Sequence, residues 1–356
     1  MRKRSSGLAA RGGRVWTDLL LRVVVPLVVI AGLLLGYRFL WVGPRDRLVV
    51  YCTHDSIYSK QVLEEFEERS GIATSMVFDT EATKSLGLVE RLIREKNAPR
   101  CDVFWNNELL GTMDLAERGM LLGYKGSGFA RIPDAFKDPE GLWVGFAARM
   151  RVIIVNIAKM QPTEGAMSAA LDGDLSRAAI AKPLYGTTLT HYAVLWDHWG
   201  AERLKSWHRD IRRRGIRELT GNATVKNLVA EGVCDFGFTD TDDYFDARDE
   251  GKPVTMFPVR LDDGRVISIP NSVCILKGSR RVEAAKKLVD YLLSEEVELV
   301  LADSKARQIP LGQVAGARLN ADVRELKNWA EQGYPLPRLG KARTDCLVWL
   351  KSEYLK

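Results

Sequence analysis

The sequence lacks the cysteine pattern of a disulfide framework or of a structural zinc site. Its 356 residues include five cysteines and four histidines, with no Cys-x-x-Cys pair and no Cys/His spacing of the zinc-finger kind. Most of these cysteines lie in short apolar runs that are predicted strands, namely Cys52, Cys101, Cys234 and Cys274. We therefore expect them to be small buried hydrophobic side chains.

The sequence has no excess of basic side chains outside the N-terminal segment. The chain has a formal net charge of +6, but residues 1–47 hold nine basic and two acidic side chains, so residues 48–356 carry −1. This balance removes the main argument for a nucleic-acid partner, which would need a basic face. The sequence also lacks internal repeats, a glycine-rich phosphate loop and an obvious nucleophile or general base at a fixed spacing from its acidic residues. We therefore do not expect an enzyme.

A long apolar run near the N-terminus predicts a membrane segment. It extends from Val23 to Tyr37 and reaches 19–42 when the flanking arginines are counted. Residues 1–18 are a basic leader, so the positive-inside rule places them in the cytoplasm and the rest of the chain outside, in the periplasm or at the cell surface. We expect an uncleaved signal-anchor. A cleaved signal peptide is the alternative, although the run has no Ala-x-Ala site and no cysteine near its end.

After the leader, short apolar runs alternate with amphipathic helices. Predicted strands at 48–52, 72–78 and 102–105 are separated by predicted helices at 58–70 and 84–96. This order predicts an α/β fold with a doubly wound parallel sheet. A second α/β unit follows, after extended apolar stretches at 143–148 and 152–156 that are split by two arginines.

The length of the segment after the leader, about 309 residues, exceeds one typical domain and predicts two lobes. Lobe 1 would comprise residues 48–148 and 266–319, and lobe 2 would comprise residues 149–265. Residues 320–356 are predicted C-terminal helices that pack on a lobe. Extended stretches near 148–152 and 260–272 would cross between the lobes.

Polar turns follow the predicted strands and form two groups, one in each lobe. Ligand crevices of open α/β sheets lie outside the carboxyl ends of the strands, so both groups are candidate ligand-binding edges. Two lobes that face one crevice can close around a small ligand. The candidates are Thr53, His54, Asp55, Glu81, Asn107 and Glu108 in lobe 1, and Arg149, Gly186, Thr187, Thr188, His191, Asn222, Thr241, Asp242 and Asp243 in lobe 2.

The segment Thr239-Asp240-Thr241-Asp242-Asp243 is the most informative of these turns. It follows a predicted buried strand, and three crowded carboxylates repel one another unless a cation or hydrogen-bond donors meet them. We therefore expect this segment to contact a ligand. One alternative is that Asp240 or Asp242 caps the following helix. Another is a two-carboxylate metal site of a hydrolase or transferase, formed by Asp240 and Asp242.

The segment Gly186-Thr187-Thr188 begins a predicted helix and is a candidate anion site. Free backbone N–H groups and the helix dipole attract anions there, although ordinary helix capping by the threonines is the alternative. Arg149 and Arg151 alternate on one strand and share a face, so both could contact a phosphate or carboxylate, or pair with the acidic segment. His191, one turn into the helix, is either a ligand contact or a packed residue.

Several segments in order resemble a known protein family. They are VVYCTHD (49–55), GIATSMVFDTEATK (71–84), CDVFWNNE (101–108), GFAARMRVIIVN (145–156), YGTTLTH (185–191), FGFTDTDD (236–243), IPNSV (269–273) and ARQIPL (306–311). Together they resemble the ferric-ion-binding branch of the extracytoplasmic substrate-binding proteins of ABC importers. The resemblance implies a two-lobed type II periplasmic-binding-protein fold and no catalysis. It also implies two partners, a membrane permease that receives the solute and a separate ATPase.

The ferric site of that family is not reproduced in this sequence. Where the family has two adjacent iron-binding tyrosines, this chain has Thr241 and Asp242, and Asp55 occupies the place of a histidine that helps in some members. A family glutamate falls near Asn107–Glu108. Asp242 and Asp243, with Glu108, could hold a hard cation through oxygen ligands. This sequence matches the family's anion subsite better than its iron site, with Gly186–Thr188 and Asn222 at the anion-binding positions.

These observations predict a membrane-anchored, monomeric solute-binding component of an ABC importer, with no cofactor. The expected solute is small and bears a phosphate- or phosphonate-like anion. Thr187, Thr188 and Asn222 would hold the anion, while Asp242 and Asp243 would accept hydrogen bonds from its other end. The alternatives are a ferric or other metal–anion complex bound by the same kind of protein, the metal-dependent hydrolase, and a solute-sensing module that contacts a signalling receptor.

Overall fold

The computed structural model describes residues 47–79 and 86–354. The predicted leader and signal-anchor, and the candidate Glu81, lie outside these residues. Among the residues that are described, no helix has the length and apolar character needed to cross a membrane.

The first part of the sheet is parallel. Strand β1 (Leu48–Cys52) lies between β2 (Thr74–Phe78) and β3 (Val103–Asn106), and both neighbours run parallel to it. The connecting helices are α3 (Ser56–Ser70) and α4 (Leu86–Arg94). This arrangement confirms the β-α-β-α-β order predicted from the sequence, and it brings the carboxyl ends of β1 and β3 to one edge.

One long strand joins this part of the sheet to the rest. Strand β5 (Val144–Asn156) is buried along all 13 residues. Its first half pairs with β10 (Ser268–Leu276), and its second half pairs with β8 (Phe236–Asp240) and β9 (Val254–Pro258). Two separate extended stretches were expected here. The structure forms one strand because its two arginines take part in the ladder. The strand is irregular at Ala147, which adopts a left-handed conformation with φ of 43°, beside a shift in the β5–β10 register.

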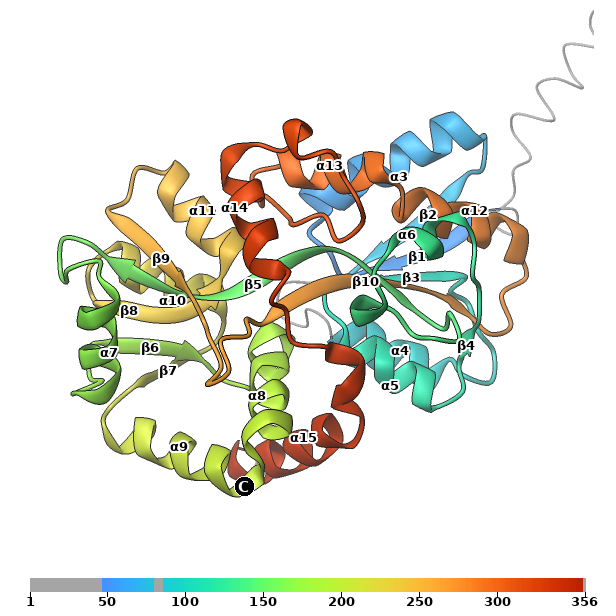
Figure 1. Cartoon of the computed structure of the whole chain (residues 1–356). Helices are drawn as coiled ribbons and strands as arrows, with labels where there is room; N and C mark the ends of the chain where they lie inside the picture. The colour runs from blue at the N-terminus through green and yellow to red at the C-terminus, as the bar shows by residue number, and fades with distance from the viewer. Residues whose placement is uncertain (1–46, 80–85, 355–356) are drawn as a thin grey trace, which may run out of the picture. The chain divides into compact units, whose positions relative to one another are not determined.

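The whole sheet has the order β2-β1-β3-β10-β5-β8-β6-β7 (Figure 1). Strands β6 (Ala178–Ala181) and β7 (Arg217–Leu219) continue it in parallel beyond β8, and β4 (Leu121–Leu122) pairs with β10. The remaining helices are α5 (Leu110–Glu117), α6 (Ser127–Arg131), α7 (Glu164–Asp172), α8 (Gly186–Trp199), α9 (Ala201–Arg213), α10 (Asn222–Ala230), α11 (Thr241–Asp249), α12 (Val282–Leu292), α13 (Glu295–Asp303), α14 (Ala321–Ala330) and α15 (Gly340–Tyr354). Short 3-10 turns lie at Asp134–Phe136, Gly316–Arg318 and Leu336–Leu339.

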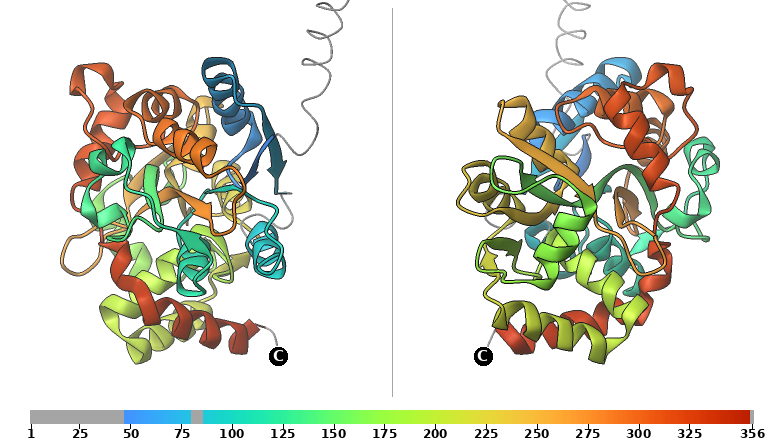
Figure 2. Two further views of the ribbon diagram at one scale, coloured as in Figure 1. Left: turned by 90° about the vertical axis from the view of Figure 1, so that its right-hand side faces the viewer. Right: turned by 60° about the vertical axis from the view of Figure 1, so that its left-hand side comes forward.

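The two C-terminal helices pack on different elements. The carboxylate of Asp322 in α14 accepts hydrogen bonds from Arg248 of α11. Helix α15 lies against α8 (Figure 2), where the rings of Trp349 and Trp196 are 5.7 Å apart. These contacts attach both helices to the elements that follow β5.

All five cysteines are buried and free. Burial raises the pKa of the Cys52 and Cys346 thiols to about 12. The expectation of small buried hydrophobic side chains is therefore confirmed.

Candidate functional site

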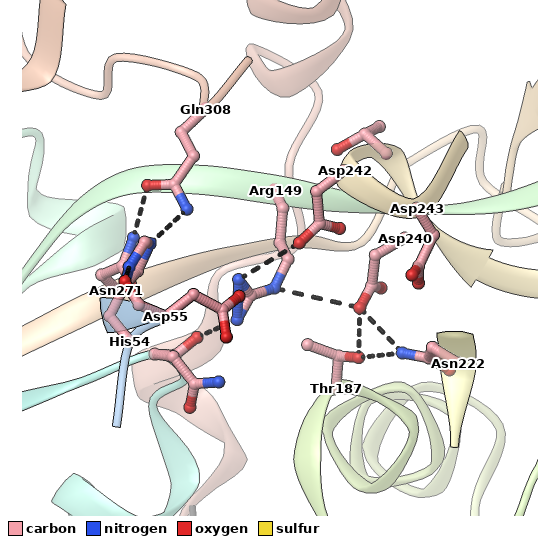
Figure 3. Close-up of polar contacts among 12 residues, drawn as sticks. His54, Asp55, Arg149, Thr187, Asn222, Asp240, Asp242, Asp243, Asn271 and Gln308 are labelled. Atoms are coloured by element: carbon pink, nitrogen blue, oxygen red, sulfur yellow. Dashed lines mark hydrogen bonds and ion pairs between the residues drawn. The ribbon is translucent and has the colours of Figure 1, made fainter. Parts of the chain in front are cut away.

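Side chains from both parts of the sheet line a pocket of about 460 Å³. It lies outside the carboxyl ends of β1, β3 and β8, next to the first turns of α8, α10 and α11. Figure 3 shows its polar contacts. The lining residues are Asp55, Asn107, Arg149, Ala181, Lys182, Tyr185, Gly186, Thr187, Thr188, Thr220, Gly221, Asn222, Ala223, Asp240, Asp242 and Asp243.

Asp240, the last residue of β8, is a buried hydrogen-bonding centre. Its Oδ1 accepts a hydrogen bond of 2.8 Å from Arg151 Nη1, directly across the β5–β8 ladder. Its Oδ2 accepts from Thr187 Oγ1 at 2.5 Å and from Asn222 Nδ2 at 2.9 Å. Asp240 thus ties together β5, β8 and the first turns of α8 and α10.

Asp242 and Asp243 lie in the first turn of α11, where Asp243 Oδ2 accepts a hydrogen bond from Thr239 Oγ1. One oxygen from each of Asp240, Asp242 and Asp243 lies within 4.8 Å of the others. Asp242 Oδ1 is buried and accepts no hydrogen bond within the described residues. Burial raises the pKa of Asp242, and burial together with its acidic neighbours raises the pKa of Asp243 to about 7. We call these three residues the acidic cluster.

The capping alternative for the acidic segment is wrong. Asp240 occupies the N-cap position of α11, but its side chain makes no capping hydrogen bond. Its carboxylate is directed instead at Arg151, Thr187 and Asn222.

Arg149 lies at the centre of the pocket and contacts both parts of the sheet (Figure 3). Its Nη1 is 3.7 Å from Asp242 Oδ2 and its Nε is 3.9 Å from Asp240 Oδ2. Its Nη2 donates to the backbone oxygen of Asn107. The alternative in which Arg149 pairs with the acidic segment is therefore confirmed, although Arg149 also lines the pocket. The expectation that Arg151 also reaches a ligand is wrong, because its side chain is fully buried beneath Asp240.

Two helix N-termini supply the anion-attracting side of the pocket. Helix α8 begins at Gly186, whose φ is 61°, and no side chain caps its first turn. The first turn of α10 follows Gly221, again without a side-chain cap. The two helices are connected by Thr188 Oγ1, which donates to Asn222 Oδ1 at 3.2 Å. Uncapped first turns leave backbone N–H donors and the positive end of the helix dipole for a bound anion.

The chain matches the family described as bacterial extracellular solute-binding protein over residues 61–315. It belongs to this family. As a solute-binding protein it acts outside the cytoplasm, and proteins of the family deliver their solute to the permease and ATPase of an ABC importer. The resemblance found in the sequence is therefore confirmed.

Curated relatives of this solute-binding protein include iron uptake proteins. It is 24% identical to Iron uptake protein A1 of Synechocystis over 317 residues, which cover 84% of this chain and 85% of that protein. It is 23% identical to Iron uptake protein A2 of the same organism over 239 residues, which cover 61% of this chain and 66% of that protein.

Solved structures show that this solute-binding protein has the two-lobed periplasmic-binding-protein fold. Iron-bound HitA from Pseudomonas aeruginosa superposes with a TM-score of 0.68 at 20% identity, over 84% of this chain and 99% of that chain. AfuA from Actinobacillus pleuropneumoniae, solved with fructose-6-phosphate, superposes with a TM-score of 0.69 at 22% identity, over 86% of this chain and 98% of that chain.

Several residues predicted for the site of this solute-binding protein lie behind the pocket instead of lining it. Thr53 is buried, and its hydroxyl bonds the side chain of Asn106 at 2.8 Å. His54 is also buried, with Nε2 2.7 Å from the Gln308 amide nitrogen (Figure 3). Thr241 is fully buried, and its hydroxyl accepts a hydrogen bond of 3.2 Å from the Met150 N–H.

Glu108 and His191 are directed elsewhere. The Glu108 carboxylate accepts the N–H groups of Leu110 and Gly111 at the start of α5, and burial raises its pKa. This position conflicts with the expected role of Glu108 as a metal ligand. His191 lines a different cavity, of about 610 Å³, together with residues of α7 and α9. Burial and the nearby Arg151 lower the pKa of His191 well below its ordinary value.

Some lining residues of this solute-binding protein were not predicted. Lys182, Tyr185 and Thr220 lie in loops that precede α8 and α10, and the Tyr185 hydroxyl donates to the Thr220 carbonyl at 2.7 Å. Their only sequence signal is that they precede predicted helix starts, where a ligand loop of an α/β fold would lie.

Proposed function

We propose that this solute-binding protein captures a metal cation together with a small oxyanion, and delivers the pair to an ABC permease. The observation that carries the proposal is the acidic cluster beside two uncapped helix N-termini in one pocket. The sequence favoured a phosphate-bearing solute and gave the metal–anion complex as the alternative. The iron uptake relatives and the iron-bound neighbour support the alternative more strongly.

The acidic cluster provides the ligand chemistry for a hard cation. Carboxylate oxygens are the preferred ligands of such ions, and here Asp242 has an oxygen with no hydrogen bond in the described residues. Burial raises the pKa of Asp242 and of Asp243, and the neighbouring carboxylates raise it further, so the two carboxylates need additional positive charge to ionise fully. A bound cation would supply that charge. Tyr185 lines the pocket, but its hydroxyl donates to the Thr220 carbonyl at 2.7 Å, so we expect the cation to be held by carboxylates instead of tyrosinates.

The other half of the pocket suits the accompanying oxyanion. The first turns of α8 and α10 converge there through Thr187, Thr188 and Asn222. Lys182 also lines the pocket and adds a positive charge at its exposed rim. An oxyanion bound at this place would lie beside the acidic cluster and could complete the coordination of the cation.

Metal titration of the purified full-length protein tests the proposal. Calorimetry with Fe³⁺, supplied as its nitrilotriacetate complex, should show one site per chain, with tighter binding when phosphate is present. The double variant Asp242→Asn/Asp243→Asn should bind at least tenfold more weakly. Asp263→Asn is the matched control, because Asp263 pairs with Arg265 at 2.6 Å and does not line the pocket. Undiminished metal binding by the double variant would contradict the proposal.

A phosphorylated organic solute is the second candidate. It is favoured by the fructose-6-phosphate in the AfuA neighbour and by the proximity of Arg149 to the helix N-termini. Calorimetry with fructose 6-phosphate in the presence of EDTA separates the two candidates. Tight binding without metal, together with no uptake of Fe³⁺, would replace the first proposal with the second. The hydrolase alternative has no comparable support, because the family is one of binding proteins.

The lobe boundaries and the membrane tether belong to the same proposal. We propose that residues 48–148 and 266–319 form one lobe, residues 149–265 the other, and that β5 and β10 provide the hinge around which they close. The segment 19–42 would tether the protein to the membrane next to its permease. Separation of membrane and soluble fractions after spheroplast formation tests the tether, since a released protein would appear in the soluble fraction.

A further inference from the structure

Two arginines on alternate positions of β5 meet the acidic cluster in different ways. Arg151 is fully buried and donates to Asp240 Oδ1 at 2.8 Å, a well-formed charged hydrogen bond. Among the described residues, Arg149 makes no hydrogen bond to a carboxylate, because its nitrogens remain 3.7 Å from Asp242 and 3.9 Å from Asp240. Arg151 is therefore a fixed partner, while Arg149 is held to the acidic cluster by charge alone.

Arg149 is the described cation that lies nearest to Asp242, while Arg151 meets the acidic cluster at Asp240. No other Lys or Arg of the described residues lies within 4.0 Å of Asp242. Asp55, Asp240, Asp242 and Asp243 all favour the charged form of Arg149 and raise its pKa, against the opposing effect of burial. Its guanidinium thus occupies the region that an external cation would need, since two positive charges repel each other at this range.

We propose that Arg149 is a displaceable internal counter-ion of the acidic cluster, which an incoming cation must replace. This inference rests on the proposed function. Its physical basis is the geometry: the contacts to Asp240 and Asp242 are long, so little hydrogen-bond energy is lost when the guanidinium withdraws. The released guanidinium then faces the oxyanion side of the pocket, where planar N–H donors bind phosphate-like groups well.

The proposal makes Arg149 a specificity-determining residue. In the empty protein it offsets part of the charge of the acidic cluster and donates to the backbone oxygen of Asn107, which follows β3. A weakly charged or weakly binding cation would not displace it. A strongly binding cation would displace it and thereby also break the contact between β5 and the Asn107 loop. Cation binding would therefore be coupled to a change between the two parts of the sheet.

The sign of the effect in Arg149→Gln separates this role from a supporting one. If Arg149 competes with the cation, Fe³⁺ supplied as nitrilotriacetate should bind the purified full-length variant at least tenfold more tightly than the wild type, and added phosphate should increase the affinity less. Arg149→Lys, which retains the charge, should stay within about threefold of the wild type. Arg177→Gln is the matched control, because Arg177 pairs with Asp235 at 2.7 Å at the opposite end of β8.

A measurement on the wild-type chain keeps the test valid if Arg149→Gln does not fold. The experiment is NMR of the wild-type protein with Ga³⁺, a diamagnetic substitute for Fe³⁺. The Nε–H resonance of Arg149 is assigned by its loss in Arg149→Lys. When Ga³⁺ is added, this resonance should shift and its proton should exchange faster with water. An unchanged resonance in the loaded protein, or weaker metal binding by a folded Arg149→Gln, would overturn the inference while leaving the proposed function intact. If neither the wild type nor Arg149→Gln takes up metal, the proposed function itself fails and the inference falls with it.

Discussion

At the end of β8, the carboxylate of Asp240 is buried in the pocket wall and contacts Arg151, Thr187 and Asn222. Two residues later, the carboxylate of Asp242 has one buried oxygen without a hydrogen bond in the described residues and only a long contact to Arg149. The difference arises because a strand end places Asp240 against its neighbouring strand, whereas the first turn of α11 turns Asp242 toward the pocket.

This comparison separates two uses of an acidic side chain. A buried carboxylate that is paired and fully hydrogen-bonded fixes the elements around it, and its removal leaves a buried charge behind. A buried carboxylate oxygen without a hydrogen bond destabilises the empty protein, and a ligand that bonds this oxygen removes the destabilisation. Asp240 is therefore expected to govern stability, while Asp242 and Asp243 are expected to govern binding.

The largest expected effect is that of Asp240→Asn. The substitution leaves the Arg151 guanidinium buried without its counter-charge, so we expect the free energy of unfolding to fall by about 3–5 kcal/mol. Urea denaturation, monitored by circular dichroism, measures this change in the free energy of unfolding. Asp242→Asn is the comparison variant and should change the free energy of unfolding by less than about 1 kcal/mol, since it removes repulsion as well as an ion pair. Equal losses in the two variants would break the distinction.

A smaller effect is expected at two adjacent threonines. The buried hydroxyl of Thr187 donates to Asp240, so Thr187→Val should lower the free energy of unfolding by about 1–3 kcal/mol. The Thr188 hydroxyl donates to the Asn222 amide oxygen at 3.2 Å and not to a carboxylate of the described residues, so Thr188→Val should cost less stability but should weaken phosphate binding. Thermal unfolding and phosphate titration of both variants test the contrast. A reversed order would show that the anion side of the pocket does not depend on Asp240.

The smallest expected effect is a dependence of stability on pH. The pKa of Asp243 is raised from 3.8 to about 7 in the folded protein, so the folded state holds a proton that the unfolded state releases between these values. The stability of the empty protein should therefore fall as pH rises from about 4 to about 7, by roughly 1 kcal/mol once partial solvent contact is allowed for. Asp243→Asn should flatten this part of the curve. A rise in stability over the same range would contradict the assignment.

Much of the fold was predictable from local patterns in the sequence. The strands before Thr53 and before Asn107 and the helix that begins at Gly186 follow from apolar runs, turn residues and the place of glycine. Because ligand loops of such sheets follow strand ends, the sequence also indicated Asp55, Asn107 and Asp242 as pocket residues, and the structure places all three there.

The depth of each side chain was not predictable in the same way. The alternation of a strand places Arg149 and Arg151 on one face, but the neighbouring strand of β5 changes between them: β5 pairs with β10 up to Met150 and with β8 from Arg151 onward. Arg151 then lies directly across from Asp240 and is covered, while Arg149 stays in the pocket. His191 follows the same rule: its helix was predicted, but its side chain faces a second cavity because α8 presents only its first turn to the pocket.

By itself, the sequence determined the order of strands and helices, the burial of the cysteines and the loops from which a ligand site could be built, because these depend on side-chain periodicity and turn chemistry within short segments. Only the tertiary structure decided which carboxylate became a structural partner and which stayed open to a ligand. That choice depends on the strand that lies alongside, and residues as far apart as Arg151, Thr187 and Asp240 become neighbours only when the sheet has formed.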